Sequence, residues 1–204
     1  TWLAGRVADY NALRERLLPA DLARHLVEES LDLDRFAHYV LRNYVKNALG
    51  DFEAHLDDDE HLYYVAVARQ RIVEALRQRL IDDLGGYLSA TSMGALTLTD
   101  ADFKANRGTV TLRSEATGAS TLEVRVRRRD DGTWRIDDVD DGQTVSRRYR
   151  DRFRETIDRR YSPAVLETQL RQLDFVVLED FTASGDGELP LGWRWRDRDE
   201  HGRK

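Results

Sequence analysis

The spacing of apolar residues predicts that the first half of the chain is helical. Apolar side chains recur every three or four positions over residues 6–18, 20–30 and 31–50, a spacing that places them on one face of an α-helix. Pro19 suits the first turn of the second helix, because that position leaves its backbone N–H unpaired. The polar, acidic segment 51–58 separates these helices from the next apolar stripe.

The longest helix is predicted over residues 59–90. Aliphatic residues form a stripe along one side of this segment, and charged residues such as Arg69 and Asp82 occupy the other side. Gly85 and Gly86 interrupt the pattern, so we expect a bend near the end of the helix.

From about residue 95 the apolar residues alternate with polar ones, which predicts β-strands. Short connections of hairpin type, such as NRG and RDDG, separate the alternating segments. Val124 and Val126 alternate with Arg125 and Arg127, which indicates an antiparallel sheet with one apolar and one wet face. The four predicted strands span residues 95–103, 107–116, 120–129 and 133–139.

Beyond Gly142 the helical spacing returns over residues 145–157, and Pro163 opens a last short helix. This order predicts an α+β fold: a helical N-terminal half packed on a curled four-stranded antiparallel sheet, closed by C-terminal helices, in a nuclear-transport-factor-like roll. We expect the helices to bury their apolar stripes against the sheet. Residues 1–174 form this domain, and residues 175–204 form a C-terminal extension or the start of a further β-rich module.

Composition narrows the classes of function. The 204 residues are 41% hydrophobic and 34% charged with a formal net charge of −6, which argues against a dedicated nucleic-acid binder. Cysteine is absent, which excludes disulfides, thiolate metal sites and cysteine nucleophiles. No apolar run approaches the roughly 20 residues that a membrane-spanning helix needs.

The acidic stretch DDVDDG at 137–142 has three interpretations: a calcium loop, a catalytic carboxylate cluster, or a junction between a strand and a helix. A calcium loop of the EF-hand type that starts at the first aspartate has Gly142 correctly at its sixth position. Its third and twelfth positions are Val139 and Arg148, which do not ligate calcium. We therefore favour the junction.

A second possible metal site involves two histidines beside the acidic segment, His55 and His61. Their spacing of six does not place both on one helical face, and acidic residues are ordinary at the start of a helix. We predict neither a metal site nor a cofactor.

Asp138 shares strand parity with Trp134 and Ile136, so we expect it to point inward. One interpretation makes it the acid or base of a roll-fold enzyme that acts on a small apolar substrate. The other makes it structural, paired with an arginine such as Arg150 or capping the helix after Gly142. We favour the structural role and predict no catalytic residue, because no histidine in the sheet or the closing helix completes a dyad.

Three parts of the chain resemble the MlaC, or toluene-tolerance, family of periplasmic phospholipid shuttles. The strongest resemblance is to a family pattern that begins with Trp in the last predicted strand. The family pattern continues through an acid–Gly turn to an Asn-Tyr-Arg string followed by Phe. The positions that follow this pattern are Trp134, Ile136, Asp138, Val139, Asp141, Gly142, Tyr149, Arg150 and Phe153. The other two are residues 31–49, where Asp34 falls near a family acid, and the sheet from Gly108 to Arg129.

The resemblance covers residues 10–173 and rests on the order of weak motifs. The chain departs from the family pattern in five places. Residues 143–146 are more polar, the strand after Trp134 is one residue short, and no Trp follows Asn43. The segment 51–58 and the residues after 174 are additional.

The resemblance implies a non-enzymatic, soluble carrier that holds phospholipid acyl chains between sheet and helices and leaves the head group near the surface. It implies a periplasmic protein with its signal peptide removed, and the chain does begin with Thr1 rather than Met. The implied partners are phospholipid, an inner-membrane ABC transporter complex and an outer-membrane lipoprotein–porin complex that maintain outer-membrane lipid asymmetry, with transient membrane contact and no nucleic acid. An alternative is a binding module of a larger envelope protein.

The resemblance also implies which side chains line the cavity. Burial of each methylene contributes about 0.8 kcal/mol, so wide aliphatic faces suit acyl chains. The predicted lining residues are Val40, Tyr44, Val73, Leu76, Leu80, Leu84, Leu88, Val110, Leu112, Leu122, Val124, Val126, Trp134, Ile136, Tyr149 and Phe153. The alternative is that these residues form an ordinary close-packed core. The arginines of residues 147–154 are interpreted as a solvated helix face that also suits anionic head groups.

Overall fold

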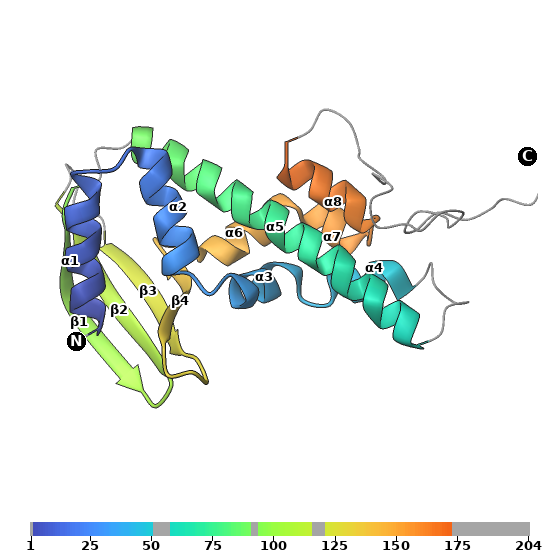
Figure 1. Cartoon of the computed structure of the whole chain (residues 1–204), viewed down its shortest axis with the longest axis horizontal. Helices are drawn as coiled ribbons and strands as arrows, with labels where there is room; N and C mark the ends of the chain where they lie inside the picture. The colour runs from blue at the N-terminus through green and yellow to red at the C-terminus, as the bar shows by residue number, and fades with distance from the viewer. Residues whose placement is uncertain (1, 51–57, 91–93, 116–120, 173–204) are drawn as a thin grey trace, which may run out of the picture.

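The computed structural model of the chain describes residues 2–50, 58–90, 94–115 and 121–172 (Figure 1). The acidic segment with His55 and the C-terminal extension 175–204 lie outside the described residues.

The helices and strands follow the order that the apolar spacing predicts, with an α+β composition. Their bounds are α1 Trp2–Arg14, α2 Pro19–Glu29, α3 Leu33–Leu41, α4 Tyr44–Gly50, α5 Asp58–Ala90, β1 Leu96–Lys104, β2 Arg107–Ser114, β3 Thr121–Arg128, β4 Trp134–Asp140, α6 Val145–Arg152, α7 Arg154–Asp158 and α8 Pro163–Leu170. The predicted fold class is confirmed. Within the described segments, no helix is both long and apolar enough to cross a bilayer.

The strands form an open antiparallel sheet in the order β1-β2-β3-β4. Two register irregularities interrupt it, one between Leu98 and Asp100 in β1 and one opposite Arg125 and Val126 in β3. Such bulges bend and twist a sheet locally. The free edge of β1 is partly covered at Leu96, whose backbone N–H and C=O both bond to the side chain of Asn11 in α1 at 2.9 Å.

Two predicted helices are each divided in two. Arg42 adopts a φ of 49° between α3 and α4, and Phe153 leaves helical geometry between α6 and α7. The helix α5 continues through both glycines to Ala90. Gly85 faces α2, since a Cβ there would be in van der Waals contact with the Cα of Ala20 at 3.4 Å.

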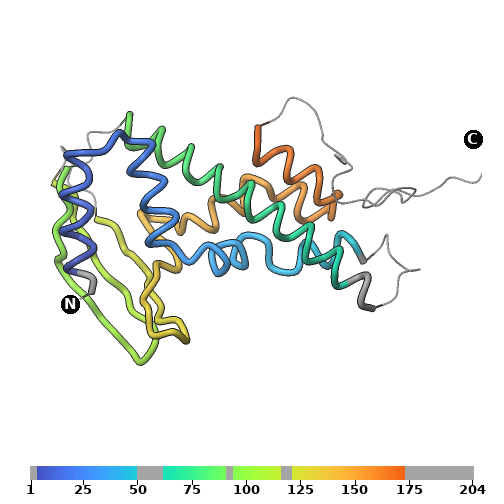
Figure 2. The backbone as a smooth tube through the Cα atoms, in the orientation of Figure 1, coloured from blue at the N-terminus to red at the C-terminus, as the bar shows by residue number. Residues whose placement is uncertain are grey.

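The long helix α5 packs mainly against other helices and not against the sheet. It lies antiparallel to α2, since Gly85 faces Ala20 and Arg77 pairs with Glu28 (Figure 2). Figure 1 shows the sheet at one end of the molecule, with α1 across it and α5 extending away toward α4, α7 and α8. The expectation that the helices bury their stripes against the sheet is therefore wrong for α5, whose apolar side meets α2, α3, α4 and α8.

Candidate functional site

The buried apolar side chains divide into two clusters. The first, called the helical cluster, is centred on Ile72, Ala75 and Leu76 of α5. Phe36 and Val40 of α3 pack into the same cluster. Helices α2, α4, α6, α7 and α8 or the residues beside them complete it, so it is a core shared among helices.

Two buried tyrosines tie the edges of the helical cluster to polar groups. The Tyr44 hydroxyl donates to the backbone oxygen of Tyr161 at 2.7 Å, which holds α4 against the start of α8. The Tyr149 hydroxyl donates to Oδ2 of Asp83 at 2.7 Å, which holds α6 against α5. Burial raises the pKa of both tyrosines, so both hydroxyls stay protonated as donors at neutral pH.

The second cluster, called the sheet cluster, lies on the apolar face of β2 and β3. Its buried members are Val110, Leu112, Val124 and Val126. Partly buried side chains from β1, β3, β4 and α1 surround it, namely Val7, Leu96, Leu98, Leu122, Trp134, Ile136 and Val139. The alternation along β2 and β3 predicted this apolar face correctly.

The predicted lining residues are shared between the two clusters. Those in or against the helical cluster are Val40, Tyr44, Val73, Leu76, Leu80, Leu84, Leu88, Tyr149 and Phe153. Those in or against the sheet cluster are Val110, Leu112, Leu122, Val124, Val126, Trp134 and Ile136. The structure therefore brings each group together internally and does not join the two groups in one cluster.

The link between α2 and α3 attaches the helical half to the edge strand β4. The backbone N–H of Asp32 donates to the oxygen of Ile136 at 2.8 Å, and the N–H of Ile136 donates to the oxygen of Ser30 at 2.8 Å. Arg135 of β4 also donates to the backbone oxygens of Glu28 and Glu29, at the C-terminal end of α2. A cation is favourable there because the end of a helix carries partial negative charge.

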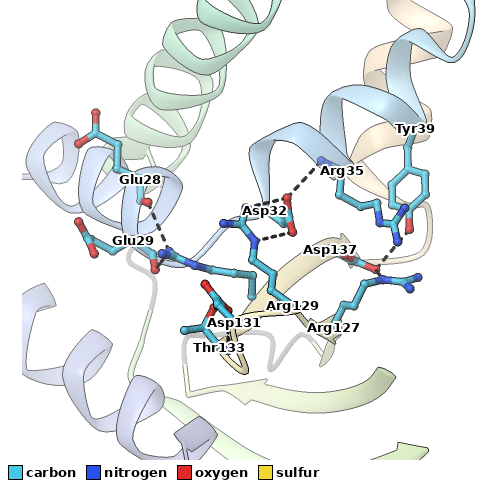
Figure 3. Close-up of polar contacts among 11 residues, drawn as sticks. Glu28, Glu29, Asp32, Arg35, Tyr39, Arg127, Arg129, Asp131, Thr133 and Asp137 are labelled. Atoms are coloured by element: carbon cyan, nitrogen blue, oxygen red, sulfur yellow. Dashed lines mark hydrogen bonds and ion pairs between the residues drawn. The ribbon is translucent and has the colours of Figure 1, made fainter. Parts of the chain in front are cut away.

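Asp32 is the centre of the first polar contact at this junction (Figure 3). Arg129, just after β3, donates from two nitrogens to its two carboxylate oxygens, each at 2.9 Å. The backbone N–H of Arg35 donates to the same carboxylate at 3.2 Å, so Asp32 also caps α3. Burial opposes ionisation of Asp32, but the hydrogen bonds from Arg129 and Arg35 outweigh it and hold its pKa below the ordinary value.

Asp137 is the centre of the second polar contact. Its Oδ2 accepts from Nε of Arg127 at 3.0 Å and from the hydroxyl of Tyr39 in α3 at 3.3 Å. Among the described residues, its buried Oδ1 has no hydrogen-bond partner. Burial opposes the charge on Arg127, but the hydrogen bond to Asp137 outweighs it and raises the pKa of Arg127. Figure 3 shows the two contacts side by side between the α3 helix and the β3–β4 hairpin.

Asp138 is buried, as expected, but it does not share the parity of Trp134 and Ile136, so the face predicted for it is wrong. In β4, Ile136 pairs with Val126 and Asp138 pairs with Arg125, so Asp137 is the extra residue of a bulge. The bulge moves Asp138 to the face opposite the sheet cluster and leaves Val139 on the apolar side.

Asp138 binds the start of α6. Its Oδ1 accepts from the backbone N–H of Ser146 at 3.1 Å, and its Oδ2 accepts from the Ser146 hydroxyl. Of the two structural alternatives, helix capping is confirmed and pairing with Arg150 is wrong. Arg150 donates instead to the backbone oxygen of Val40 at 3.0 Å and pairs with Asp158.

The other aspartates of the acidic stretch are also engaged by the protein. Asp140 accepts from the N–H of Gly142 at 2.9 Å, and Asp141 pairs with Arg148 at 3.0 Å. The stretch ends β4 and starts α6, as the junction interpretation predicts. Within the described ranges, no group of three metal-ligating side chains lies together.

Sequence reasoning missed the polar junction of Asp32, Asp137, Arg127, Arg129 and Arg135. Its arginines alternate along β3 and β4, so they resemble an ordinary wet face. The sequence does show a high density of arginine around the β3–β4 turn, which could have pointed to this junction. It does not reveal the partners, because each ion pair joins positions about 10 or 97 residues apart, and the long one depends on the fold.

Comparison with known proteins finds similarity in structure but not in sequence. No protein-family model matches the chain. No curated protein matches it either. Among solved structures, the fold is similar to that of a phospholipid-binding protein from Ralstonia solanacearum solved in complex with a phospholipid. The two share 18% sequence identity with a TM-score of 0.55, over 81% of this chain and 88% of the other.

Proposed function

We propose that this protein is a non-enzymatic carrier that binds the acyl chains of a phospholipid. The observation that carries the proposal is the fold shared with the Ralstonia phospholipid-binding protein, which spans most of both chains. A shared fold alone does not fix function, so the proposal also draws on the composition of the apolar faces.

The acyl chains lie, in this proposal, between the sheet cluster and the helical cluster. The two clusters hold separate sets of buried side chains, so the boundary between them separates without breaking either core. Both clusters consist mainly of aliphatic groups, which favour alkyl chains over water by about 0.8 kcal/mol for each methylene buried. A bilayer offers acyl chains nearly the same environment, so uptake and release are close to balanced.

The order of motifs from Trp134 to Phe153 supports a finer proposal, membership of the MlaC family. On that basis we propose a periplasmic protein that receives and delivers lipid at membrane complexes. An inner-membrane ABC transporter complex and an outer-membrane lipoprotein–porin complex are the proposed partners. A catalytic role for Asp138 is not proposed, since both of its oxygens bind Ser146.

Lipid extraction from purified protein tests the proposal. Protein prepared without detergent should contain phospholipid in extracts and show a lipid-bound mass in native mass spectrometry. Val124→Phe, which fills space in the sheet cluster, should lower the lipid content. Val165→Phe, on α8 and outside the predicted lining, is the matched control. Protein that is folded but contains no phospholipid, and takes none up from vesicles, would contradict the proposal.

A further inference from the structure

One end of the sheet carries a row of cations on its wet face. The turns of the β1–β2 and β3–β4 hairpins lie at this end, and the backbone N–H of Arg128 bonds to the oxygen of Asn106 between them at 2.8 Å. In the observed register, four basic residues stand opposite one another across the four strands, namely Lys104, Arg107, Arg127 and Arg135. Like charges in direct cross-strand register destabilise a sheet, so this row has an energetic cost.

The half of this row that lies near the helices is held by shielded contacts. Arg127 pairs with Asp137, and Arg135 donates to the C-terminal carbonyls of α2. The other half is different. Lys104 has a side chain that is 86% exposed, and it forms a 3.7 Å ion pair with the exposed Asp102, which solvent screens. Arg107 is exposed and forms no ion pair with any residue in the described ranges.

An exposed aromatic ring lies at the same end of the sheet, on the face opposite these two cations. Phe103 is 45% exposed, although it sits on the same face as the sheet cluster. Its ring meets the ring of Trp134 edge to face, with 5.1 Å between centroids. It also lies across Gly108, where a Cβ would come within 2.5 Å of the ring. Phe103 is therefore held in place while nearly half of its surface meets solvent.

The shape of this end favours contact with a flat surface. Figure 1 shows the two hairpin turns protruding below the helices, with α5 and α8 directed away from them. A stable protein–protein interface needs about 800 Å² from each partner, which a five-residue hairpin end does not supply. A bilayer surface requires less area, because an aromatic ring at the interface and a few cations near anionic lipids are each favourable.

We propose that the β1–β2 hairpin end, Phe103–Arg107, docks on the surface of an anionic lipid bilayer. Phe103 enters the interfacial region, and Lys104 and Arg107 lie at the level of the phosphate groups. This inference rests on the proposed function, because a lipid carrier must approach the membranes with which it exchanges lipid. It uses residues outside the proposed acyl-chain lining, so each proposal is tested separately.

A single fluorescent label tests the docking. The sequence contains no cysteine, so Asn106→Cys at the hairpin turn gives one site for a polarity-sensitive dye. Vesicles of phosphatidylcholine with phosphatidylglycerol should shift the emission of this label to the blue, and salt should reverse the shift. Pure phosphatidylcholine vesicles should have little effect. A label at Asn47→Cys, exposed on α4, should not respond to either vesicle.

Charge variants of the labelled protein measure how much each cation contributes to vesicle binding. Each of Lys104→Ala and Arg107→Ala should weaken vesicle binding about fivefold, since one basic residue near an anionic surface contributes about that factor. Arg113→Ala is the matched control, because Arg113 is an exposed cation at the other end of β2. It should change binding less than twofold. Melting temperatures confirm that each variant is folded.

Several results would overturn the docking proposal. They are an absent shift with anionic vesicles, an equal shift with neutral vesicles, and equal losses in the Arg113 control. A shift that grows with protein concentration in the absence of vesicles would assign the end to a second copy of the chain. A shift with polyglutamate but not with vesicles would assign it to an acidic protein. Lipid extraction from Lys104→Ala/Arg107→Ala protein should give normal phospholipid content, so loss of docking is distinguishable from loss of the carrier function.

Discussion

The helical cluster and the sheet cluster differ in extent, in enclosure and in how their edges are held. Helices from both halves of the sequence surround the helical cluster, and buried Tyr44 and Tyr149 bond its rim to fixed polar groups. The sheet cluster has a small buried centre and a broad rim of partly buried side chains. The first is a conventional enclosed core, whereas most of the apolar side chains of the second are only partly buried. We therefore predict that the helical cluster contributes most of the stability and that, in the proposed carrier, the sheet cluster makes most of the contacts with the acyl chains.

Truncation of one leucine in each cluster tests this division and should give the largest effect. Leu76→Ala removes a side chain with no exposure from α5 and should lower the unfolding free energy by about 4 kcal/mol. Leu112→Ala in the sheet cluster should cost about 2 kcal/mol, because its site is less enclosed. Urea unfolding measures both. Equal losses would contradict the difference between the clusters.

The next effect concerns the junction that joins the clusters. Asp32→Ala removes the contact with Arg129 and the cap of α3, and should cost about 3 kcal/mol by the typical values for a charged hydrogen bond and a helix cap. Arg129→Ala should cost less, because Arg129 is 38% exposed and the cap remains. A double-mutant cycle in urea should show coupling between the two residues. Strict additivity would mean that the pair does not hold the junction.

A part of the Asp32 contribution should depend on pH. The pKa of Asp32 is lower in the folded protein than in the unfolded chain, where the pKa of an aspartate is about 3.9. Its stabilising contribution is therefore complete above that value and is lost as the pH falls through the lower, folded pKa. As the pH is lowered into the acid range, the unfolding free energy should fall more steeply for the natural protein than for the Asp32→Asn variant. Equal slopes for the two proteins would exclude this contribution of Asp32.

Ser146→Ala tests the bulge that redirects Asp138. Removal of the hydroxyl leaves one buried carboxylate oxygen of Asp138 without this donor, and should cost about 1.5 kcal/mol. Thermal unfolding measures the loss. Phospholipid content should stay unchanged, because the pair lies on the face opposite the sheet cluster. Loss of lipid without loss of stability would place this pair in the binding site.

Tyr39→Phe should give the smallest effect. The bond from its hydroxyl to Asp137 is long, at 3.3 Å, and Arg127 continues to bind the same oxygen. We expect a loss of about 0.5 kcal/mol in the unfolding free energy. A loss as large as that of Asp32→Ala would show that the two polar contacts act as one unit.

The periodicity of the sequence was sufficient to predict most of the elements and their order. Apolar residues at helical spacing located α5, and alternation located β2 and β3, because each pattern reflects one local geometry. Local signals did not reveal the break at Arg42, since a left-handed arginine carries no mark in the sequence. The bulge at Asp137 also escaped prediction, and one extra residue reversed the face assigned to Asp138.

The candidate site was harder to predict than the fold. The apolar residues could be identified from the sequence. Their spacing did not indicate, however, that α5 and the sheet bury them in separate clusters. The pair of Asp32 with Arg129 joins residues 97 positions apart, so it depends on the tertiary arrangement. The exposed hairpin end combines an aromatic residue and two cations within five positions, but its significance depends on the register and exposure that the structure supplies.

Photocrosslinking with a phospholipid that carries a diazirine near the end of an acyl chain tests the central claim most directly. Peptide mapping after irradiation should locate adducts on the inward side chains of β2 and β3, around Leu112, Val124 and Val126, with fewer on the enclosed centre of the helical cluster near Leu76. Adducts confined to exposed positions, or their absence in folded protein that has been incubated with lipid, would contradict a carrier that holds acyl chains against the sheet.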